Sequence, residues 1–306
     1  MIEKRFIFVG NRRFVLEEML AARLGLVAIL IIDHSHLQRD FHSGILPPLP
    51  NIYTISNKAD LLNFLNHNQF DILVSNGCPY ILPVEHLPHA QYVNIHPSFL
   101  PDLRGSDPTI GSLLFKRDSG ATCHVMDKGI DTGPIISQVR IPFTDDLDVI
   151  TLYQLSFIAE KRVFKEALER DFIPKCSQKK THADLYYSRK PEDRIITFQE
   201  SNEEILCKVR AFNNRSQGCE FIAKGNSYRV YGATRMINPF LMERVCEFDE
   251  GVVALSYENN IIFKKDREIL RLQSVFATDG SAPEVGDRLF GTATLSNPFL
   301  KKIALS

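Results

Sequence analysis

The stretch Val27-Ala28-Ile29-Leu30-Ile31-Ile32 is apolar at every position, which predicts a β-strand covered on both faces, as strands in parallel sheets are. Helices should then pack on either side of it, and the segments Phe14–Leu24 and Ala59–Asn66 space their apolar residues three and four apart, as such helices do. Three shorter runs predict further strands, at Arg5–Val9, Ile52–Ile55 and Asp71–Ser75. Strands and helices that alternate in this way indicate an α/β domain around a mostly parallel sheet.

The same pattern continues to about residue 170 and then changes. Further strands are predicted at Gln91–Ile95, Ala121–Met126 and Ile135–Ile141, and helices at Thr109–Lys116 and Asp148–Arg170. After a polar stretch and one more helix, Asn202–Phe212, short alternating runs predict a small β-barrel or sandwich. These runs are Ser227–Tyr231, Gly251–Tyr257, Ile261–Lys264 and Glu268–Ser274. We therefore predict a first domain at residues 1–172, a linker at 173–194 and a β-rich C-terminal domain at 195–306.

Composition and charge narrow the classes of function. The chain has 306 residues, enough for two domains, and 44% of them are hydrophobic, as in folded proteins. With 36 Lys and Arg against 37 Asp and Glu, the net charge is −1, so no positive field favours a nucleic-acid partner. The longest apolar run, Leu24–Ile32, is far shorter than the roughly 20 residues that cross a bilayer, and the N-terminus shows no secretion signal. We expect a cytoplasmic protein without a membrane partner.

Metal and disulfide sites are not indicated. The six cysteines are scattered without a C-x-x-C pair, as expected of free thiols in a reducing compartment. His34, His36 and His42 are close in sequence but lack acidic partners at metal-ligand spacing. The sequence therefore predicts chemistry that needs no metal.

The densest group of polar residues lies where the strand Gln91–Ile95 ends. Asn94 and His96 are two residues apart, so their side chains leave the strand on the same face, beyond the carboxyl end where parallel sheets bind ligands. An amide can donate to a developing oxyanion, and an imidazole can take a proton or, once protonated, stabilise negative charge. Asp131, in a loop that contains Gly129 and Gly133, can orient the imidazole. Taken alone, Asn94 is typical of a turn residue, His96 of a structural group and the Asp131 loop of a tight turn, but together they fit the attack of an amine on a carbonyl-level carbon.

The segment Asn94-Ile95-His96-Pro97-Ser98-Phe99-Leu100-Pro101 and the later Asp-x-Gly loop resemble the formyltransferase family that uses 10-formyltetrahydrofolate. The resemblance implies a Rossmann-like formyltransferase fold followed by an OB-like C-terminal domain, with Asn94, His96 and Asp131 as catalytic residues. It also implies a folate site made by the loop after residue 75, the turn after His96 and the loop after Val125. The implied folate contacts are Asn76, Gly77, Pro79, Tyr80, Ile81, Leu82, Ser98, Leu100, Pro101, Met126, Asp127, Gly129 and Ile130.

The C-terminal half limits the choice of substrate. Lys190-Pro191-Glu192-Asp193 and Val209-Arg210-Ala211-Phe212-Asn213 resemble the start of the second domain in methionyl-tRNA formyltransferases and in some sugar-nucleotide formyltransferases. Residues 183–306 hold 17 Lys and Arg against 17 Asp and Glu, whereas an enzyme acting on tRNA should be more basic. The favoured hypothesis is therefore formylation of a nucleotide-linked amino sugar in surface-glycan (lipopolysaccharide) synthesis. A methionyl-tRNA formyltransferase and a non-catalytic folate- or nucleotide-binding module are the alternatives.

Under the favoured hypothesis the partner is a small molecule whose pyrophosphate needs a cationic contact. The candidate substrate contacts are Arg12, Arg13, Arg104 and Gly105. Nucleic acid is not expected as a partner, and the sequence leaves open whether the protein is a monomer or a homodimer.

Overall fold

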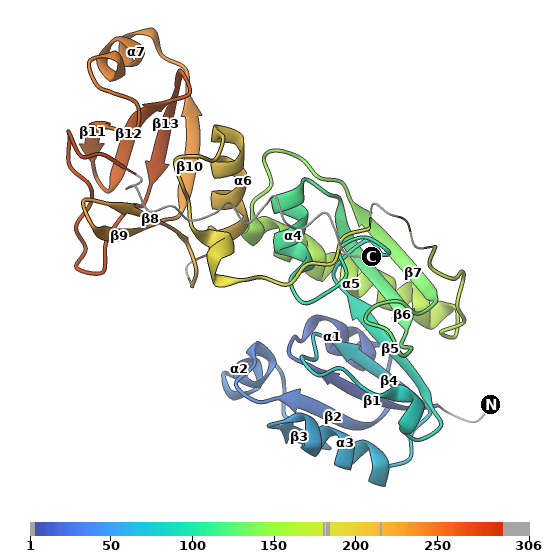
Figure 1. Cartoon of the computed structure of the whole chain (residues 1–306). Coiled ribbons are helices and arrows are strands. Elements are labelled where there is room, and N and C mark those ends of the chain that lie inside the picture. The colour runs from blue at the N-terminus through green and yellow to red at the C-terminus, as the bar shows by residue number, and fades with distance from the viewer. Residues whose placement is uncertain (1–3, 180, 182–183, 215, 290–306) are drawn as a thin grey trace. The chain divides into compact units, whose positions relative to one another are not determined.

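The computed structural model describes residues 4–179, 181, 184–214 and 216–289, and it divides into two compact units (Figure 1). The first unit consists of Met1–Thr109, Asp118–Phe143 and Tyr153–Ser188. The second consists of Ile110–Arg117, Thr144–Leu152 and Arg189–Ser306. In the part of the chain that is described, no helix combines the length and the apolar character needed to span a bilayer.

The first unit is built on one seven-stranded sheet with the order β3-β2-β1-β4-β5-β6-β7. The strands are β1 (Arg5–Gly10), β2 (Gly25–Ile32), β3 (Ile52–Ile55), β4 (Ile72–Asn76), β5 (Gln91–His96), β6 (Ser119–Val125) and β7 (Ile135–Ile141). The first five strands in this order pair in parallel, and β6 and β7 are antiparallel to their neighbours. The prediction of an α/β domain around a mostly parallel sheet is confirmed.

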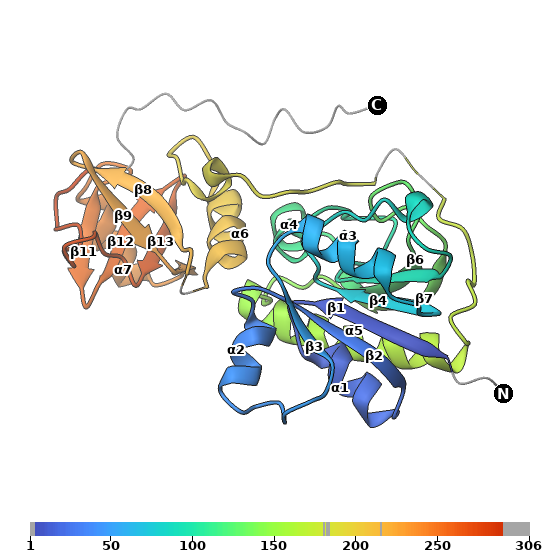
Figure 2. The ribbon, with the colours of Figure 1, turned by 90° about the horizontal axis from the view of Figure 1, so that it is seen from below.

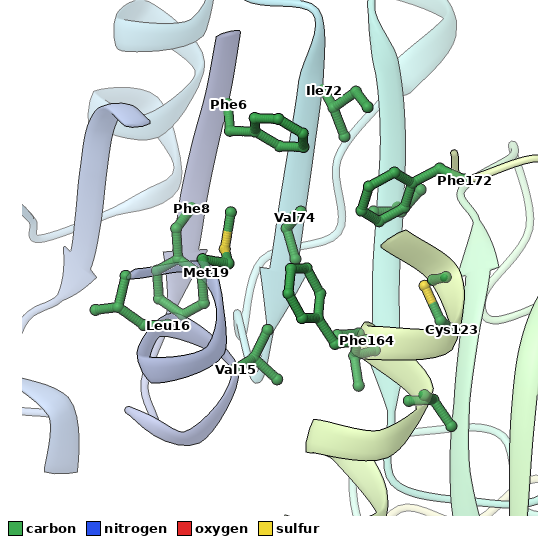
Figure 3. Close-up of a cluster of buried hydrophobic side chains, with 14 of the residues drawn as sticks. Phe6, Phe8, Val15, Leu16, Met19, Ile72, Val74, Cys123, Phe164 and Phe172 are labelled. Atoms are coloured by element: carbon green, nitrogen blue, oxygen red, sulfur yellow. The ribbon is translucent and has the colours of Figure 1, made fainter. Parts of the chain in front are cut away.

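Both faces of this sheet are covered, as the apolar stretch in β2 predicts. Along β1, Phe6 and Phe8 point into one hydrophobic cluster, and the alternate residues Ile7 and Val9 point into another on the opposite face. Helices α1 (Phe14–Ala21) and α5 (Val149–Glu169) cover the first face, and α3 (Lys58–His67) covers the second (Figure 2). Figure 3 shows the first cluster, where Phe164 of α5 packs between side chains from β1, β4 and α1. The sheet is thereby held rigidly beneath the loops that follow its strands.

The helix boundaries follow local signals. Helix α3 begins after Asn57, whose side chain accepts a hydrogen bond from the Asp60 N–H at 3.0 Å, a standard N-cap. Helix α1 ends three residues earlier than predicted, because Arg23 takes a left-handed conformation (φ 52°) before β2 begins. Two further helices in this part of the chain are α2 (His36–His42) and α4 (Pro108–Phe115).

The segment Ile173–Ser188, most of the predicted linker, belongs to the first unit. Its backbone forms isolated bridges from Cys176 to Ile135 and from Tyr186 to Arg104. At these two described positions the segment is joined to the first unit.

The second unit contains antiparallel strands, which confirms the predicted β-rich character of the C-terminal part. Strands β8 (Cys219–Ala223) and β9 (Asn226–Val230) form a hairpin, and a four-stranded sheet has the order β10-β13-β12-β11. The four strands are β10 (Gly232–Met236), β11 (Val253–Tyr257), β12 (Asn260–Lys265) and β13 (Glu268–Gln273). Helices α6 (Asn202–Phe212) and α7 (Pro239–Cys246) complete this unit, with short 3-10 turns at Val84–His86 in the first unit and Pro191–Arg194 in the second.

Candidate active site

A cavity of about 410 Å³ opens in the first unit, where the loops after β1, β4 and β5 meet. This is the carboxyl edge of the parallel strands, the position at which open α/β sheets bind ligands. The cavity is lined by Asn11, Arg12, Ser75, Gly77, Cys78, Pro79, Tyr80, Ile81, Leu82, Asn94, Ile95, His96, Pro97, Gly105, Ser106, Pro108, His124, Met126, Asp127, Gly129, Ile130, Asp131 and Tyr186. The three residues with a predicted catalytic role are all among them.

Asn94, His124 and Asp131 form one contact group. The Asn94 amide nitrogen lies 3.3 Å from Oδ1 of Asp131 and 3.4 Å from Nε2 of His124. Asn94 and His124 face each other because β5 and β6 are antiparallel and pair these two residues in register. Both contacts are longer than the usual 2.9 to 3.0 Å of an N–H···O bond, so the amide can exchange them for a stronger acceptor.

His96 is held by a backbone carbonyl on one side and by Asp131 on the other. Its Nε2 lies 3.0 Å from the carbonyl oxygen of Leu103, and because a carbonyl only accepts, Nε2 carries a hydrogen and donates it. Its Nδ1 lies 3.5 Å from Oδ2 of Asp131. Burial lowers the pKa of the imidazole, although the Asp131 carboxylate and the Leu103 carbonyl act in the opposite direction. The ring is therefore neutral at pH 7 and presents Nδ1 as an acceptor, so it must first take a proton before it can stabilise negative charge.

Asp131 is fixed in an uncommon backbone conformation by contacts from three directions. Its φ is 54°, a left-handed conformation that few residues other than glycine adopt. Its Oδ2 accepts a hydrogen bond from the Gly105 N–H at 3.3 Å, and its carbonyl oxygen accepts from Nε of Arg104 at 3.2 Å and Nε2 of Gln178 at 2.9 Å. Burial by itself would raise the pKa of the Asp131 carboxyl, but His96, His124 and the Gly105 N–H together lower it well below its usual value. The carboxylate is therefore ionised at neutral pH.

The Asp127–Pro134 loop that carries Asp131 is closed by its own side chains and depends on glycine. Oδ1 of Asp127 accepts from the Gly129 N–H at 3.0 Å and from the Thr132 hydroxyl at 2.6 Å. A Cβ on Gly133 would lie 1.8 Å from the carbonyl oxygen of Val125, which no packing tolerates. The glycine at 133 therefore lets the loop return close to β6.

Most of the residues implied as folate contacts line the cavity, and four do not. Those that line it are Gly77, Pro79, Tyr80, Ile81, Leu82, Met126, Asp127, Gly129 and Ile130. Ser98, Leu100 and Pro101 lie outside the lining, because their turn is bonded into the fold: the Ser98 hydroxyl donates to Asp102 and the Leu100 N–H donates to Thr122. Asn76 is fully buried behind the wall.

The three predicted arginines lie in different environments. Arg12 lines the cavity, with its guanidinium 3.0 Å from Oε1 of the buried Glu160. Arg13 lies outside the lining and pairs with Glu17 and Asp40. Arg104 is buried and holds the Asp131 loop, so it positions the site instead of facing it. Gly105 lines the cavity and bonds Asp131.

Three residues that sequence reasoning missed complete the site. His124 could have been found, because its alternation along β6 places it opposite Asn94. Gln178 donates to the carbonyl oxygens of both Asp131 and Gly133 from a segment with no periodic pattern, and Glu160 is one charged residue among many on α5. Across the described residues, no cluster of three or more His, Cys, Asp or Glu side chains could hold a metal ion.

Two family models match the chain. Formyl transferase matches residues 53–168, and Formyl transferase, C-terminal domain, matches residues 189–282. The methionyl-tRNA formyltransferase of Thermotoga neapolitana is 31% identical over 183 residues, which are 58% of this chain and 58% of that protein. The chain thus spans a little over half of the length of the curated relatives it matches.

Solved structures share the fold at low sequence identity. The sugar 3N-formyl transferase WlaRD, solved in the presence of dTDP and 5-N-formyl-THF, has a TM-score of 0.66 at 19% identity and covers 89% of this chain and 98% of its own. The N-formyltransferase from Helicobacter canadensis, solved with folinic acid and dTDP-3-aminofucose, has a TM-score of 0.65 at 20% identity, with coverages of 89% and 99%. These likenesses show the shared fold, and the two family matches, over residues 53–168 and 189–282, show that the chain belongs to the formyl transferase family.

Proposed function

We infer that the protein transfers a formyl group from 10-formyltetrahydrofolate to the amine of a nucleotide-linked amino sugar. The observation that carries this proposal is the convergence of Asn94, His96 and Asp131 on one cavity whose lining also includes Arg12. An amide donor, a neutral imidazole and an ionised carboxylate are the groups that direct attack of an amine on a formyl carbon requires.

The three side chains divide the work by position. The amide of Asn94, held only by long contacts, donates to the oxygen on which negative charge develops. Nδ1 of His96 takes the proton that the attacking amine loses, and the Asp131 carboxylate, 3.5 Å away, stabilises the imidazolium that results. His96 would then give this proton to the folate nitrogen as the bond between that nitrogen and the formyl carbon breaks, which releases tetrahydrofolate. His124 contacts both Asn94 and Asp131 and so keeps the amide and the carboxylate in register.

The cavity fits a folate. Ile81, Ile130 and Tyr186 all line it and remain 62%, 39% and 57% exposed, so they offer apolar area that a flat heteroaromatic ring would cover. Tyr80, Leu82 and Met126 extend this apolar wall. When bound, 10-formyltetrahydrofolate supplies the formyl carbon, and the backbone of Asp127–Asp131 and the loop after β4 would hold its ring.

A small anionic sugar substrate fits the charge of the site. Among the described residues that line the cavity, Arg12 is the one Lys or Arg, which suits a pyrophosphate but not a long polyanion. The net charge of −1 points the same way. WlaRD and the Helicobacter canadensis enzyme, which share this fold, were solved with dTDP or a dTDP-linked amino sugar. A place in surface-glycan synthesis follows from this substrate class as part of the proposal.

Methionyl-tRNA formylation is the second candidate, and the curated relatives favour it. Several of them carry that name at about 30% identity, for example those from Thermotoga neapolitana and Campylobacter jejuni. Binding of tRNA, however, needs a larger basic surface than a chain with a net charge of −1 is expected to offer.

The test is an acceptor panel. Release of tetrahydrofolate from 10-formyltetrahydrofolate would be followed by absorbance with dTDP- and UDP-linked amino sugars, with initiator methionyl-tRNA, and with no acceptor. We expect turnover with at least one amino sugar and none with tRNA or water alone. Turnover with tRNA only would establish the second candidate instead, and release without an acceptor would indicate a hydrolase.

A further inference from the structure

We propose that Arg12 and Glu160 form a proton-coupled anion subsite: when a phosphate oxygen of the substrate binds Arg12, Glu160 takes up one proton. This inference rests on the proposed function, since it assumes a phosphate-bearing substrate. It assigns a role to a buried carboxyl group that the reaction itself does not use.

The pair reaches the cavity from two elements of the first unit. Arg12 lies in the loop after β1 and lines the cavity, and Glu160 lies in α5, where it is completely buried. The guanidinium of Arg12 is 3.0 Å from Oε1 of Glu160 and lies 5.7 Å from the centre of the Phe157 ring, one turn earlier on α5. The cation is thus held against α5 while part of its side chain remains at the cavity wall.

Glu160 is not satisfied by this contact. Neither of its carboxylate oxygens accepts a hydrogen bond of normal geometry, and Nε of Arg12 and both polar side-chain atoms of the buried Asn76 are likewise without one. A buried ionised carboxylate costs several kcal/mol unless it is both paired and hydrogen-bonded. Arg12 is therefore the main support of the negative charge on Glu160, and the Asn76 amide adds a smaller one.

Gly77, the residue after β4, makes room for this arrangement. Gly77 has φ +74°, and a Cβ there would lie 2.2 Å from Oδ1 of Asn11 and 3.0 Å from a guanidinium nitrogen of Arg12. A side chain at residue 77 would therefore collide with Asn11 and crowd the guanidinium of Arg12.

The electrostatics set the direction of the coupling. Burial raises the pKa of the Glu160 carboxyl, and Arg12, followed by the Asn76 amide, opposes this rise. A phosphate on Arg12 brings further negative charge toward Glu160 and weakens that opposition, so the protonated form of Glu160 becomes the favoured one. Since a phosphate competes for the same cation, charge balance at the wall is then kept by one added proton.

Among the described residues, Lys161 and His96 are two further titratable groups to consider beside the pair. Lys161, next to Glu160 on α5, is engaged by Glu17 and Glu18 of α1. His96 on β5 lies within electrostatic reach of Arg12, which lowers the pKa of its imidazole. His96 is therefore the competing proton acceptor, and the experiment must separate it from Glu160.

The experiment is isothermal titration of the full chain with dTDP and with UDP between pH 5.5 and 8.5, in pairs of buffers that differ in ionisation enthalpy. The buffer dependence of the heat gives the number of protons taken up. The diphosphate's own titration is common to all protein variants, so it cancels in differences. We expect wild type to take up as much as about one proton more on binding than Glu160→Gln does. As the pH rises, the affinity of wild type for the nucleotide should therefore fall by up to about tenfold more per pH unit than the affinity of Glu160→Gln.

Matched variants keep the result interpretable. Glu166→Gln and Arg162→Met remove the same charges from exposed positions of α5 and should behave as wild type. Arg12→Met should weaken binding at least tenfold. Because removing one partner of a buried pair can unfold the protein, the double variant Arg12→Met/Glu160→Gln provides a neutral pair that should fold, bind weakly and show no uptake assigned to Glu160.

The outcomes separate the proton coupling at Glu160 from the proposed nucleotide-sugar substrate. If neither nucleotide binds wild type, the nucleotide-sugar substrate of the proposed function is wrong. If a nucleotide binds and proton uptake is the same in wild type and Glu160→Gln, the coupling proposed for Glu160 is wrong. The same holds if proton uptake persists in Glu160→Gln and vanishes in His96→Asn. In both cases the proposed function still stands.

Discussion

Asp131 is the residue on which the candidate site converges. One carboxylate oxygen lies within 3.3 Å of Asn94 and 3.5 Å of His124, and the other lies within 3.3 Å of the Gly105 N–H and 3.5 Å of His96. Such a shared acceptor couples the amide donor to the two imidazoles, so a change in one of them alters the position of the others. The effects of substitutions here should therefore not add.

The first prediction concerns the oxyanion donor. Asn94→Ala should lower kcat by about 100- to 1000-fold with little change in KM, because it removes a donor that acts mainly in the transition state. His96→Asn should cost at least as much, and a triple variant that also carries Asp131→Asn should be only slightly slower than the worst single one. Formyl transfer at saturating substrates would be measured, with exposed Asn63→Ala as the control. A loss below about threefold in both single variants would leave these side chains with a structural role only.

The second prediction concerns pH. If neutral His96 is the proton acceptor, kcat/KM falls as pH drops through its pKa, and because burial lowers that pKa, the acid limb should lie below the ordinary value of 6.5. The Asp131 carboxylate raises the pKa of His96, so Asp131→Asn should move the limb to still lower pH while reducing the maximum rate. The pH profiles of wild type and variant would be compared over the range in which both stay folded. A limb that moves to higher pH in Asp131→Asn would refute the assignment.

At the residue scale, sequence could reveal what lies close in the chain or follows strand alternation. Asn94 and His96 share a strand face by their spacing, and the glycine-containing loop offered Asp131 as a carboxylate partner, which the family resemblance then supported. It could not reveal Arg104 as a support for the loop, because the contact depends on where the backbone after β5 turns. The free cation expected of Arg12 is in fact paired, since its partner Glu160 comes from a helix almost 150 residues later.

At the scale of elements, segments with a regular apolar pattern were predictable and segments without one were not. Strands β3 and β7 and helix α6 have the predicted limits, because their apolar spacing is regular and their ends are marked by turns or caps. Helix α2 was missed because it buries one residue, Leu37, and so carries no apolar periodicity. Strand β10 was missed for a related reason, since none of its residues is fully buried and no alternation marks it.

The third prediction concerns Ile173–Ser188, which sequence suggested as linker. Gln178 from this segment donates to the carbonyl oxygens of Asp131 and Gly133 and accepts from Arg104. Gln178→Ala should leave the carbonyl oxygens of the Asp131 loop without these donors, at about 1 kcal/mol for each lost bond, and lower kcat by roughly tenfold through misplacement of the carboxylate. Kinetics and thermal unfolding would be measured beside Gln69→Ala as the control. If unfolding shifts but kcat holds, Gln178 stabilises the fold without positioning the site.

At the scale of the whole molecule, charge is the property that separates the two candidate substrates. The chain carries a net charge of −1, and one cation is found among the described residues lining the cavity. When a protein neutralises Z phosphates of a nucleic acid, the logarithm of its binding constant falls with the logarithm of the salt concentration at a slope of about −0.7Z to −0.9Z. A protein that binds tRNA through several phosphates would therefore show a steep salt dependence. A nucleotide sugar that contacts one guanidinium should lose little affinity as the salt concentration rises.

The last prediction follows from that difference. The KM for the amino-sugar substrate should rise no more than about twofold to threefold between 50 and 200 mM salt, because one or two phosphate contacts are screened, and kcat should stay constant. In Arg12→Met the residual salt dependence should nearly vanish, since the cation that carries it is gone, whereas Arg162→Met should keep the wild-type slope. Steady-state kinetics across the salt series would be run for all three proteins. A rise in KM of tenfold or more, unchanged in Arg12→Met, would contradict this prediction and place the substrate's phosphates on a wider basic surface.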